Sequence, residues 1–164
     1  MQLLVIRHAT AEDAAPDGDD ASRSLTSAGK KEMKEVAAGL KEIVESIDAI
    51  GASPLVRAQQ TAEIVAKAYG DVPIDTVDAL RPGSDPSALV EWLGHQESAE
   101  VVAIVGHEPH LGMLVTWFMT GSTDSRVALS KGGAALLEFS SRVSSGGGVL
   151  DWLLKRSQLR QLGK

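Results

Sequence analysis

Cysteine is absent from this sequence, and its absence excludes disulfide bonds, thiolate metal sites and a cysteine nucleophile. Aromatic residues are also scarce, at 4% of the chain, and the formal net charge is −6. Nucleic-acid binding needs basic patches and stacking surfaces, so this composition argues against a nucleic-acid partner. The chain also has no apolar run long enough to span a membrane. We therefore expect neither nucleic acid nor a membrane among its partners.

We expect the first apolar run of the chain to be part of the folded domain. No basic region precedes Leu3 and no small-residue cleavage site follows the run, so we interpret it as a native strand and not as a signal peptide. Together with the absence of cysteine, this favours a cytoplasmic location. The 164 residues suit one domain with a full-sized core, and no linker or repeat divides them. We expect a single domain over residues 1–164.

Apolar runs and amphipathic segments alternate along the chain. Short apolar runs predict strands, and apolar residues that recur at intervals of three and four predict helices. The predicted strands are residues 3–6, 47–53, 72–77, 101–105, 134–139 and 149–154. The first predicted helix begins after its N-cap, Thr26, and its apolar face extends to Ile47. Three further helices are predicted over residues 58–66, 87–95 and 111–120. This order predicts an α/β fold, a three-layer α/β/α sandwich with a mostly parallel sheet.

Four segments carry more specific expectations. Proline interrupts the strand at 72–77, which predicts a place at the sheet edge. The last two strands flank a Gly-rich turn, which predicts an antiparallel hairpin at an edge. Residues 155–164 are polar and basic, and we expect them to be frayed. Residues 11–24 carry several carboxylates but lack the spacing of a calcium loop, so we interpret them as a solvated loop.

Arginine and histidine residues follow three of the predicted strands. Arg7 and His8 follow the first strand, Arg57 lies between the second strand and its helix, and His107 follows the strand at 101–105. Carboxyl ends of parallel strands meet at one edge of a sheet, where such folds bind ligands. Any one of these residues also has a structural interpretation, as a surface charge or a hydrogen-bonded filler. Two guanidinium forks and two imidazoles at one edge predict an oxyanion pocket with a nucleophile.

Three motifs carry a resemblance to a known family. The segments Leu-Val-Ile-Arg-His-Ala at 4–9, Ser-Pro-Leu-Val-Arg-Ala-Gln-Gln-Thr-Ala at 53–62 and Val-Gly-His-Glu-Pro at 105–109 resemble, in order, the motifs of the histidine phosphatase superfamily. This is the phosphoglycerate mutase-like branch 1. The short chain, Ala9 after His8, and Arg23 before Leu-Thr-Ser-Ala-Gly resemble most the SixA-type phosphohistidine phosphatases.

The resemblance implies a phosphoglycerate mutase-like fold and a hydrolase that acts in two steps. His8 would form a phosphohistidine that water then cleaves. Arg7, Arg57 and His107 would act with it and bind the phosphoryl oxygens, and Arg23 would also face the phosphate. The resemblance implies no metal and no cofactor. It implies a phosphorylated protein substrate, such as a histidine phosphotransfer domain in signal transduction, and it favours a monomer.

One departure from the family bears on the substrate. Larger members carry a carboxylate after the third strand that protonates an alkoxide leaving group, whereas residues 79–86 contain no Glu there. An alkoxide leaves badly without a proton donor. The imidazole of a phosphohistidine leaves more easily, so the missing acid favours that substrate. Asp85, Glu12 and Asp13 remain candidate acids.

Two other functions stay open on the sequence alone. One is a phosphatase for small phosphomonoesters, with one of those three carboxylates as the acid. The other is a non-catalytic phosphate-binding regulatory module, although a pure binder would not need His8. His95 and His110 are interpreted as structural residues; His110 lies near His107 along the chain, but the sequence gives it no role in the site.

Overall fold

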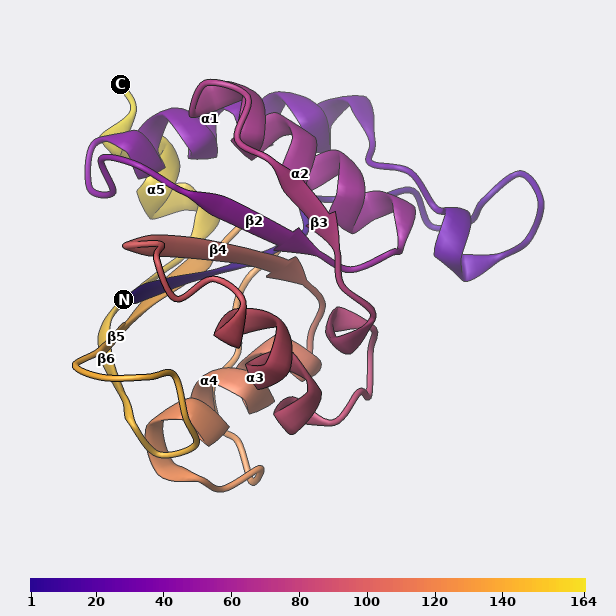
Figure 1. Cartoon of the computed structure of the whole chain (residues 1–164). Helices are drawn as coiled ribbons and strands as arrows, with labels where there is room; N and C mark the ends of the chain where they lie inside the picture. Colours follow the sequence, from indigo (N-terminus) through magenta and orange to yellow (C-terminus); the bar gives the residue numbers. More distant parts are fainter.

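The computed structural model describes residues 1–164, and a six-stranded sheet between two helical layers forms its centre (Figure 1). The strands are β1 Gln2–Arg7, β2 Ala49–Ala52, β3 Ile74–Thr76, β4 Val101–Gly106, β5 Ala134–Phe139 and β6 Gly148–Leu154. The helices are α1 Ser27–Lys41, α2 Val56–Ala68, α3 Pro86–Gly94, α4 His110–Thr120 and α5 Arg156–Leu162. Two 3₁₀ turns, η1 Asp20–Ser22 and η2 Asp78–Leu80, complete the chain.

The strands are ordered β3-β2-β4-β1-β5-β6. The first four in this order pair in parallel, while β5 pairs antiparallel with β1 and β6 antiparallel with β5. This confirms the predicted α/β fold with a mostly parallel sheet. It also confirms that the proline-interrupted strand and the C-terminal hairpin lie at the two edges. In the register, Arg7 lies beside Gly106, so the residues that follow β1 and β4 leave the sheet at the same level.

Both faces of the sheet are covered. Leu4 and Ile6 belong to a core cluster with α1, α2 and α5, whereas Leu3 and Val5 belong to a second cluster with α3 and α4. Figure 1 shows these two sets of helices on opposite sides of the strands. A strand buried on both faces has no polar alternation, which explains the continuous apolar run in β1. No helix of the fold combines the length and the apolar character needed to cross a membrane.

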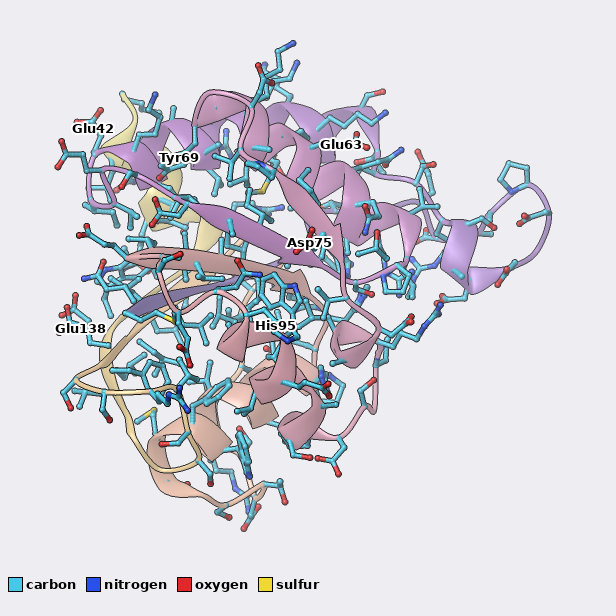
Figure 2. All side chains as sticks on the ribbon, viewed as in Figure 1. Glu42, Glu63, Tyr69, Asp75, His95 and Glu138 are labelled. Atoms are coloured by element: carbon cyan, nitrogen blue, oxygen red, sulfur yellow. The ribbon has the colours of Figure 1, made fainter.

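Helix α1 begins as predicted but ends early. Its N-cap is Thr26, whose hydroxyl accepts a hydrogen bond from the N–H of Gly29 at 2.9 Å. The helix ends at Lys41, so the prediction that the helical face continues to Ile47 was wrong. Beyond it, Val44 stays buried in irregular chain, and its carbonyl accepts the hydroxyl of Tyr69, which Figure 2 labels. Tertiary contacts bury Val44 and Ile47 without a helix, whereas Ile43 is 39% exposed.

The C-terminal segment is also different from the prediction. Residues 156–162 form α5 and do not fray, and Leu159 is completely buried against α1. Arg156 pairs with Glu32 of α1 at 2.7 Å. Gly39 lets the two helices approach closely, because a Cβ atom there would lie 1.8 Å from the Leu159 carbonyl oxygen. Only one apolar side chain of α5 is buried, so the sequence pattern was too weak to reveal the helix.

Candidate active site

The two histidines that follow β1 and β4 lie beside each other. The ring centroids of His8 and His107 are 5.2 Å apart, and the rings are inclined by 52°. Only 6% of His8 and 2% of His107 is exposed to solvent. Neighbouring parallel strands in register explain this contact, because both residues leave the sheet at one level. Arg57, also buried, comes from the first turn of α2, after the neighbouring strand β2.

Hydrogen bonds fix the backbone around His8 from three sides. Its N–H donates to the Gly106 carbonyl of β4 at 3.0 Å, and its own carbonyl accepts the N–H of Gly132 at 3.1 Å. The N–H of Ala9 donates to the Thr61 hydroxyl at 3.1 Å, and that hydroxyl donates to the Arg57 carbonyl at 2.7 Å. The turn that carries His8 is therefore tied to β4, to the segment before β5 and to α2.

The hydrogen bond of its ring sets the tautomer of His8. Nδ1 lies 2.7 Å from the carbonyl oxygen of Ala9. A carbonyl oxygen can only accept, so Nδ1 carries the proton, and Nε2 of the neutral ring keeps a free lone pair. Burial lowers the pKa of His8 to about 4, and the charges of Arg57 and Arg7 act in the same direction. At neutral pH the ring is uncharged, as a nitrogen nucleophile must be.

His107 is held by a residue that the sequence did not single out. Its Nε2 lies 2.7 Å from the hydroxyl of Ser53, which follows β2 and is completely buried. Burial lowers the pKa of His107 to about 3, and the proximity of His8 and Arg57 adds to the effect. An anion placed beside this ring would act in the opposite direction and favour its protonation.

The arginine side chains reach the site from three segments. Arg7 donates from Nη1 to the Leu129 carbonyl at 2.8 Å. Arg57 donates from Nη1 to the backbone carbonyl of Asp20 at 3.0 Å and from Nη2 to its carboxylate at 3.2 Å. Arg23 donates from Nε to the other carboxylate oxygen of Asp20 at 2.8 Å. The carboxylate of Asp20 thus bridges Arg57, which belongs to the second motif, and Arg23, which precedes the Leu-Thr segment.

Four buried side-chain nitrogens in the whole chain have no hydrogen-bond partner, and all four belong to this region. They are Nε of Arg7, Nε of Arg57, Nδ1 of His107 and Nδ1 of His110. Buried polar atoms without a partner are few and costly in folded proteins. The two arginine atoms are donors, and arginine donors suit the oxygens of a phosphoryl group. The arrangement can therefore bind a tetrahedral oxyanion beside a neutral imidazole.

Sequence reasoning missed the support behind Arg7. Oε1 of Glu108 accepts the N–H of Leu129 at 2.9 Å, while Arg7 donates to the carbonyl of the same residue. Glu108 therefore orients the segment that holds Arg7. Ser53 and Glu108 both lie inside the quoted motifs, so their positions were visible, but no local pattern indicates which atoms they contact.

The remaining candidates of the sequence analysis have other positions. Asp85 caps α3 and accepts hydrogen bonds from the N–H and the hydroxyl of Ser87, which hold the pKa of its carboxyl below the usual range. Such a group is ionised at neutral pH and is a poor proton donor. Glu12 and Asp13 are exposed in the loop before η1.

The other two histidines differ in their relation to the site. Nε2 of His110, at the start of α4, lies 3.2 Å from the Ala79 carbonyl of η2, and burial lowers the pKa of its ring. His95, labelled in Figure 2, lines a hollow of about 600 Å³ together with Met1, at the end of β1 opposite His8. No three His, Asp or Glu side chains are grouped so that they could hold a metal ion.

Comparison with known proteins identifies similar chains. A model of the histidine phosphatase superfamily (branch 1) matches residues 3–82. An uncharacterized protein of Picosynechococcus sp. is 35% identical over 135 residues, which cover 81% of this chain and 82% of that protein. Phosphohistidine phosphatase SixA of Escherichia coli is 30% identical over 166 aligned positions, covering 98% of this chain and 97% of that protein. A solved structure, the protein histidine phosphatase SixA complexed with tungstate, matches with a TM-score of 0.85 at 26% identity, covering 97% of this chain and 99% of that one.

Proposed function

The chain belongs to branch 1 of the histidine phosphatase superfamily and is SixA-like, and on this premise we propose that it is a phosphohistidine phosphatase acting on a phosphorylated protein through phospho-His8. Family membership and the similarity to SixA make the chain a phosphatase. The proposal concerns the substrate and the residues that act on it. His8 is the nucleophile, Arg7, Arg57 and His107 act with it, and Arg23 joins Arg7, Arg57 and His107 in binding the substrate.

One observation carries the proposal: a neutral, buried imidazole with a free Nε2 lies near Arg7 and Arg57, whose buried Nε atoms have no protein partner. A nucleophile without cations would be repelled by a phosphoryl dianion, and cations without a nucleophile would only bind it. The similar SixA chain was solved complexed with tungstate, which is a tetrahedral oxyanion like phosphate. The combination supports phosphoryl transfer to His8.

In the first step, the Nε2 lone pair of His8 attacks phosphorus and the bond from phosphorus to the substrate imidazole breaks. The electron pair of that bond goes to the leaving nitrogen, which takes a proton from solvent. Positive charge develops on the His8 ring, and the hydrogen bond from Nδ1 to Ala9 stabilises it. Arg7 and Arg57 neutralise the charge on the phosphoryl oxygens.

In the second step, water attacks phosphorus and the bond to Nε2 breaks, which releases inorganic phosphate and the neutral ring. The dianionic phosphoryl group favours a proton on His107, since it offsets the cations that lower the pKa of that ring. A protonated His107 donates to a phosphoryl oxygen and strengthens the anion pocket in both steps.

The environment of the candidate acid Asp85 supports a phosphohistidine substrate. Its carboxylate is engaged at the N-terminus of α3 and its pKa is lowered. A phosphomonoester needs a proton donor for its alkoxide, whereas the ring nitrogen of phosphohistidine leaves without a dedicated acid. The site therefore suits the easier leaving group.

Turnover of three substrates tests the proposal: a phosphohistidine-bearing phosphotransfer domain, a phosphoserine peptide and p-nitrophenyl phosphate. We expect the phosphohistidine protein to lose phosphate fastest, and His8→Ala to lower that rate by about 10³-fold or more. Alkaline quenching preserves the acid-labile P–N bond, so it should trap phosphate on His8 of the wild type only if the intermediate forms. Lys30→Ala, an exposed change on α1, is the control.

Three results would contradict parts of this proposal. Equal rates with the phosphoserine peptide would mean that a proton donor is present, and the function would be that of a phosphomonoesterase. Full activity of His8→Ala would exclude the nucleophile. Binding of phosphate without turnover of any substrate would favour the regulatory module.

A further inference from the structure

A second polar hollow adjoins the turn that carries His8. It has a volume of about 360 Å³ and no hydrophobic residue in its lining. We call it the cationic hollow, and its lining residues are Thr10, Ser130, Lys131, Lys155, Arg156 and Ser157. The proposed function uses none of these side chains, and the sequence analysis did not single them out.

Topology explains why the cationic hollow lies beside the active site. β5 is antiparallel to β1, so the residues before β5, including Lys131, lie at the end of the sheet where β1 delivers His8. β6 is antiparallel to β5, so Lys155, which follows β6, lies at that same end. The next residue after Lys131 is Gly132, whose N–H donates to the carbonyls of Arg7 and His8 at 3.2 and 3.1 Å. The hollow and the nucleophile therefore share one rigid turn.

The lysine charges of the hollow are not compensated within the chain. Arg156 pairs with Glu32 at 2.7 Å and donates to the Thr10 hydroxyl at 3.0 Å, so its charge is offset. Lys131 and Lys155 are exposed and form no ion pair. The charge of Lys131 reaches the active site, because it contributes to the lowered pKa of His8. No lysine of the chain forms an ion pair, and these two are distinguished by lining one hollow together, beside the turn that carries His8.

A net charge of −6 repels an acidic partner at long range, so a patch of opposite sign beside the site decides which partners can approach. A lysine carries its charge on a flexible stem, so it can pair with carboxylates at several positions on a protein surface. The rigid fork of arginine is better suited to one fixed carboxylate or phosphate group. A phosphohistidine entering the oxyanion pocket would bring the residues around it over the cationic hollow.

We propose that the cationic hollow binds carboxylate side chains of the substrate protein next to its phosphohistidine. Lys131 and Lys155 supply the charge, and the hydroxyls of Thr10, Ser130 and Ser157 supply further donors. The inference rests on the proposed function and adds a substrate preference to it: the chain prefers phosphohistidine flanked by acidic residues. No new chemical step is involved.

Two synthetic phosphohistidine peptides of equal length test this inference. In one the phosphohistidine is flanked by glutamates, and in the other by glutamines. We expect the wild type to hydrolyse the glutamate peptide with a kcat/KM about fivefold higher, mainly through a lower KM, because two exposed ion pairs supply modest energy. The preference should decline as salt is added, since exposed charges are screened.

The double variant Lys131→Glu and Lys155→Glu should lose or invert the preference. Lys131 also affects the charge at His8, so the measured quantity is the ratio of the two peptides on one enzyme, in which any effect on the chemistry cancels. The matched control is Lys34→Glu with Lys67→Glu, two lysines that line a different hollow between α1 and α2. The control should keep the wild-type ratio.

The possible failures are distinguishable. Equal kcat/KM for both peptides in the wild type, or a ratio unchanged in the Lys131 and Lys155 variant, would overturn the carboxylate subsite and leave the phosphatase intact. Hydrolysis of p-nitrophenyl phosphate without hydrolysis of either peptide would overturn the proposed phosphohistidine substrate, and the subsite with it.

Discussion

Burial lowers the pKa of both histidines that lie side by side in the site. His8 and His107 are neutral because desolvation opposes their protonation, and the nearby arginines add to this. Arg57 is itself only 5% exposed and pairs with the exposed carboxylate of Asp20. A phosphoryl group that binds Arg57 must share or displace this carboxylate. The Asp20 carboxylate is largely exposed, so water can replace the donors that it gives up and the exchange costs little.

Arg57→Ala should lower kcat/KM for a phosphohistidine protein by about 10²–10³-fold, because the variant loses a buried donor to the charge that develops on the phosphoryl oxygens. Steady-state hydrolysis measures the effect. Lys30→Ala, on the exposed side of α1, should stay within about twofold of the wild type. Similar losses in both variants would refute the assignment of Arg57 to the pocket.

Two variants, Glu108→Gln and Glu108→Ala, separate the hydrogen bond by which Glu108 positions Leu129 from the effect of its negative charge on Arg7. Gln keeps an oxygen that can accept the N–H of Leu129, whereas Ala removes it and loosens the carbonyl that Arg7 holds. We expect Gln to keep kcat/KM within about threefold and Ala to lose about tenfold, as expected for one net hydrogen bond to a charged network. If Gln were as damaging as Ala, the carboxylate charge beside Arg7 would be the important property.

At the level of elements, the carboxyl ends of the strands deliver the site and the helices hold it in place. α2 supplies both Arg57 and the Thr61 hydroxyl that anchors Ala9, so one helix positions an arginine and the turn of the proposed nucleophile. α5 contributes in a different way. It packs on α1 through Leu159 and Gly39, and its first residue, Arg156, lines the cationic hollow. A helix that the sequence pattern concealed therefore shapes the surface beside the active site.

Gly39→Ala should destabilise the fold by about 1–3 kcal/mol, because the added methyl group overlaps the Leu159 carbonyl and must push α5 away. Urea unfolding measures the change in the free energy of unfolding. Gly94→Ala, at the end of α3, is the matched control, since a Cβ atom there meets nothing within 4 Å. The control should be neutral or stabilising by up to about 1 kcal/mol. Equal behaviour of the two variants would mean that α5 is not docked as described.

For the whole molecule, the buried histidines link stability to pH. The pKa of His8 falls from 6.5 in the unfolded chain to about 4 in the folded state, and that of His107 to about 3. At a pH between the unfolded and the folded pKa values, the two rings are protonated in the unfolded chain but not in the folded protein. The free energy of unfolding should therefore be highest above pH 6.5 and should decrease as the pH falls toward 4.

His8→Asn tests this dependence, because it removes one titrating ring. The wild type should lose up to roughly 3 kcal/mol between pH 7 and pH 4 from His8 alone, at about 1.4 kcal/mol for each pKa unit. The variant should show a correspondingly shallower decrease in urea unfolding across the same range. A decrease of the same size in both proteins would show that His8 is not the group that takes up the proton.

The sequence by itself determined the features that depend on short stretches. The apolar run of β1, the cap at Thr26 and the histidine or arginine after three strands are all local patterns, and parallel strands bring such ends to one edge. The order of elements and the fold class followed from the alternation of these patterns. This is why the four residues Arg7, His8, Arg57 and His107 could be grouped before any distance was known.

Tertiary structure decided what depends on contacts between distant residues. The hydrogen bond of His107 to Ser53, the support of Arg7 by Glu108 and the bridge of Asp20 between Arg23 and Arg57 follow from register and packing, which no local pattern encodes. The same applies to α5, since a short helix gains its stability from docking and not from its own propensity. Burial also set the charge states of the histidines, because desolvation exists only once the chain has folded around them.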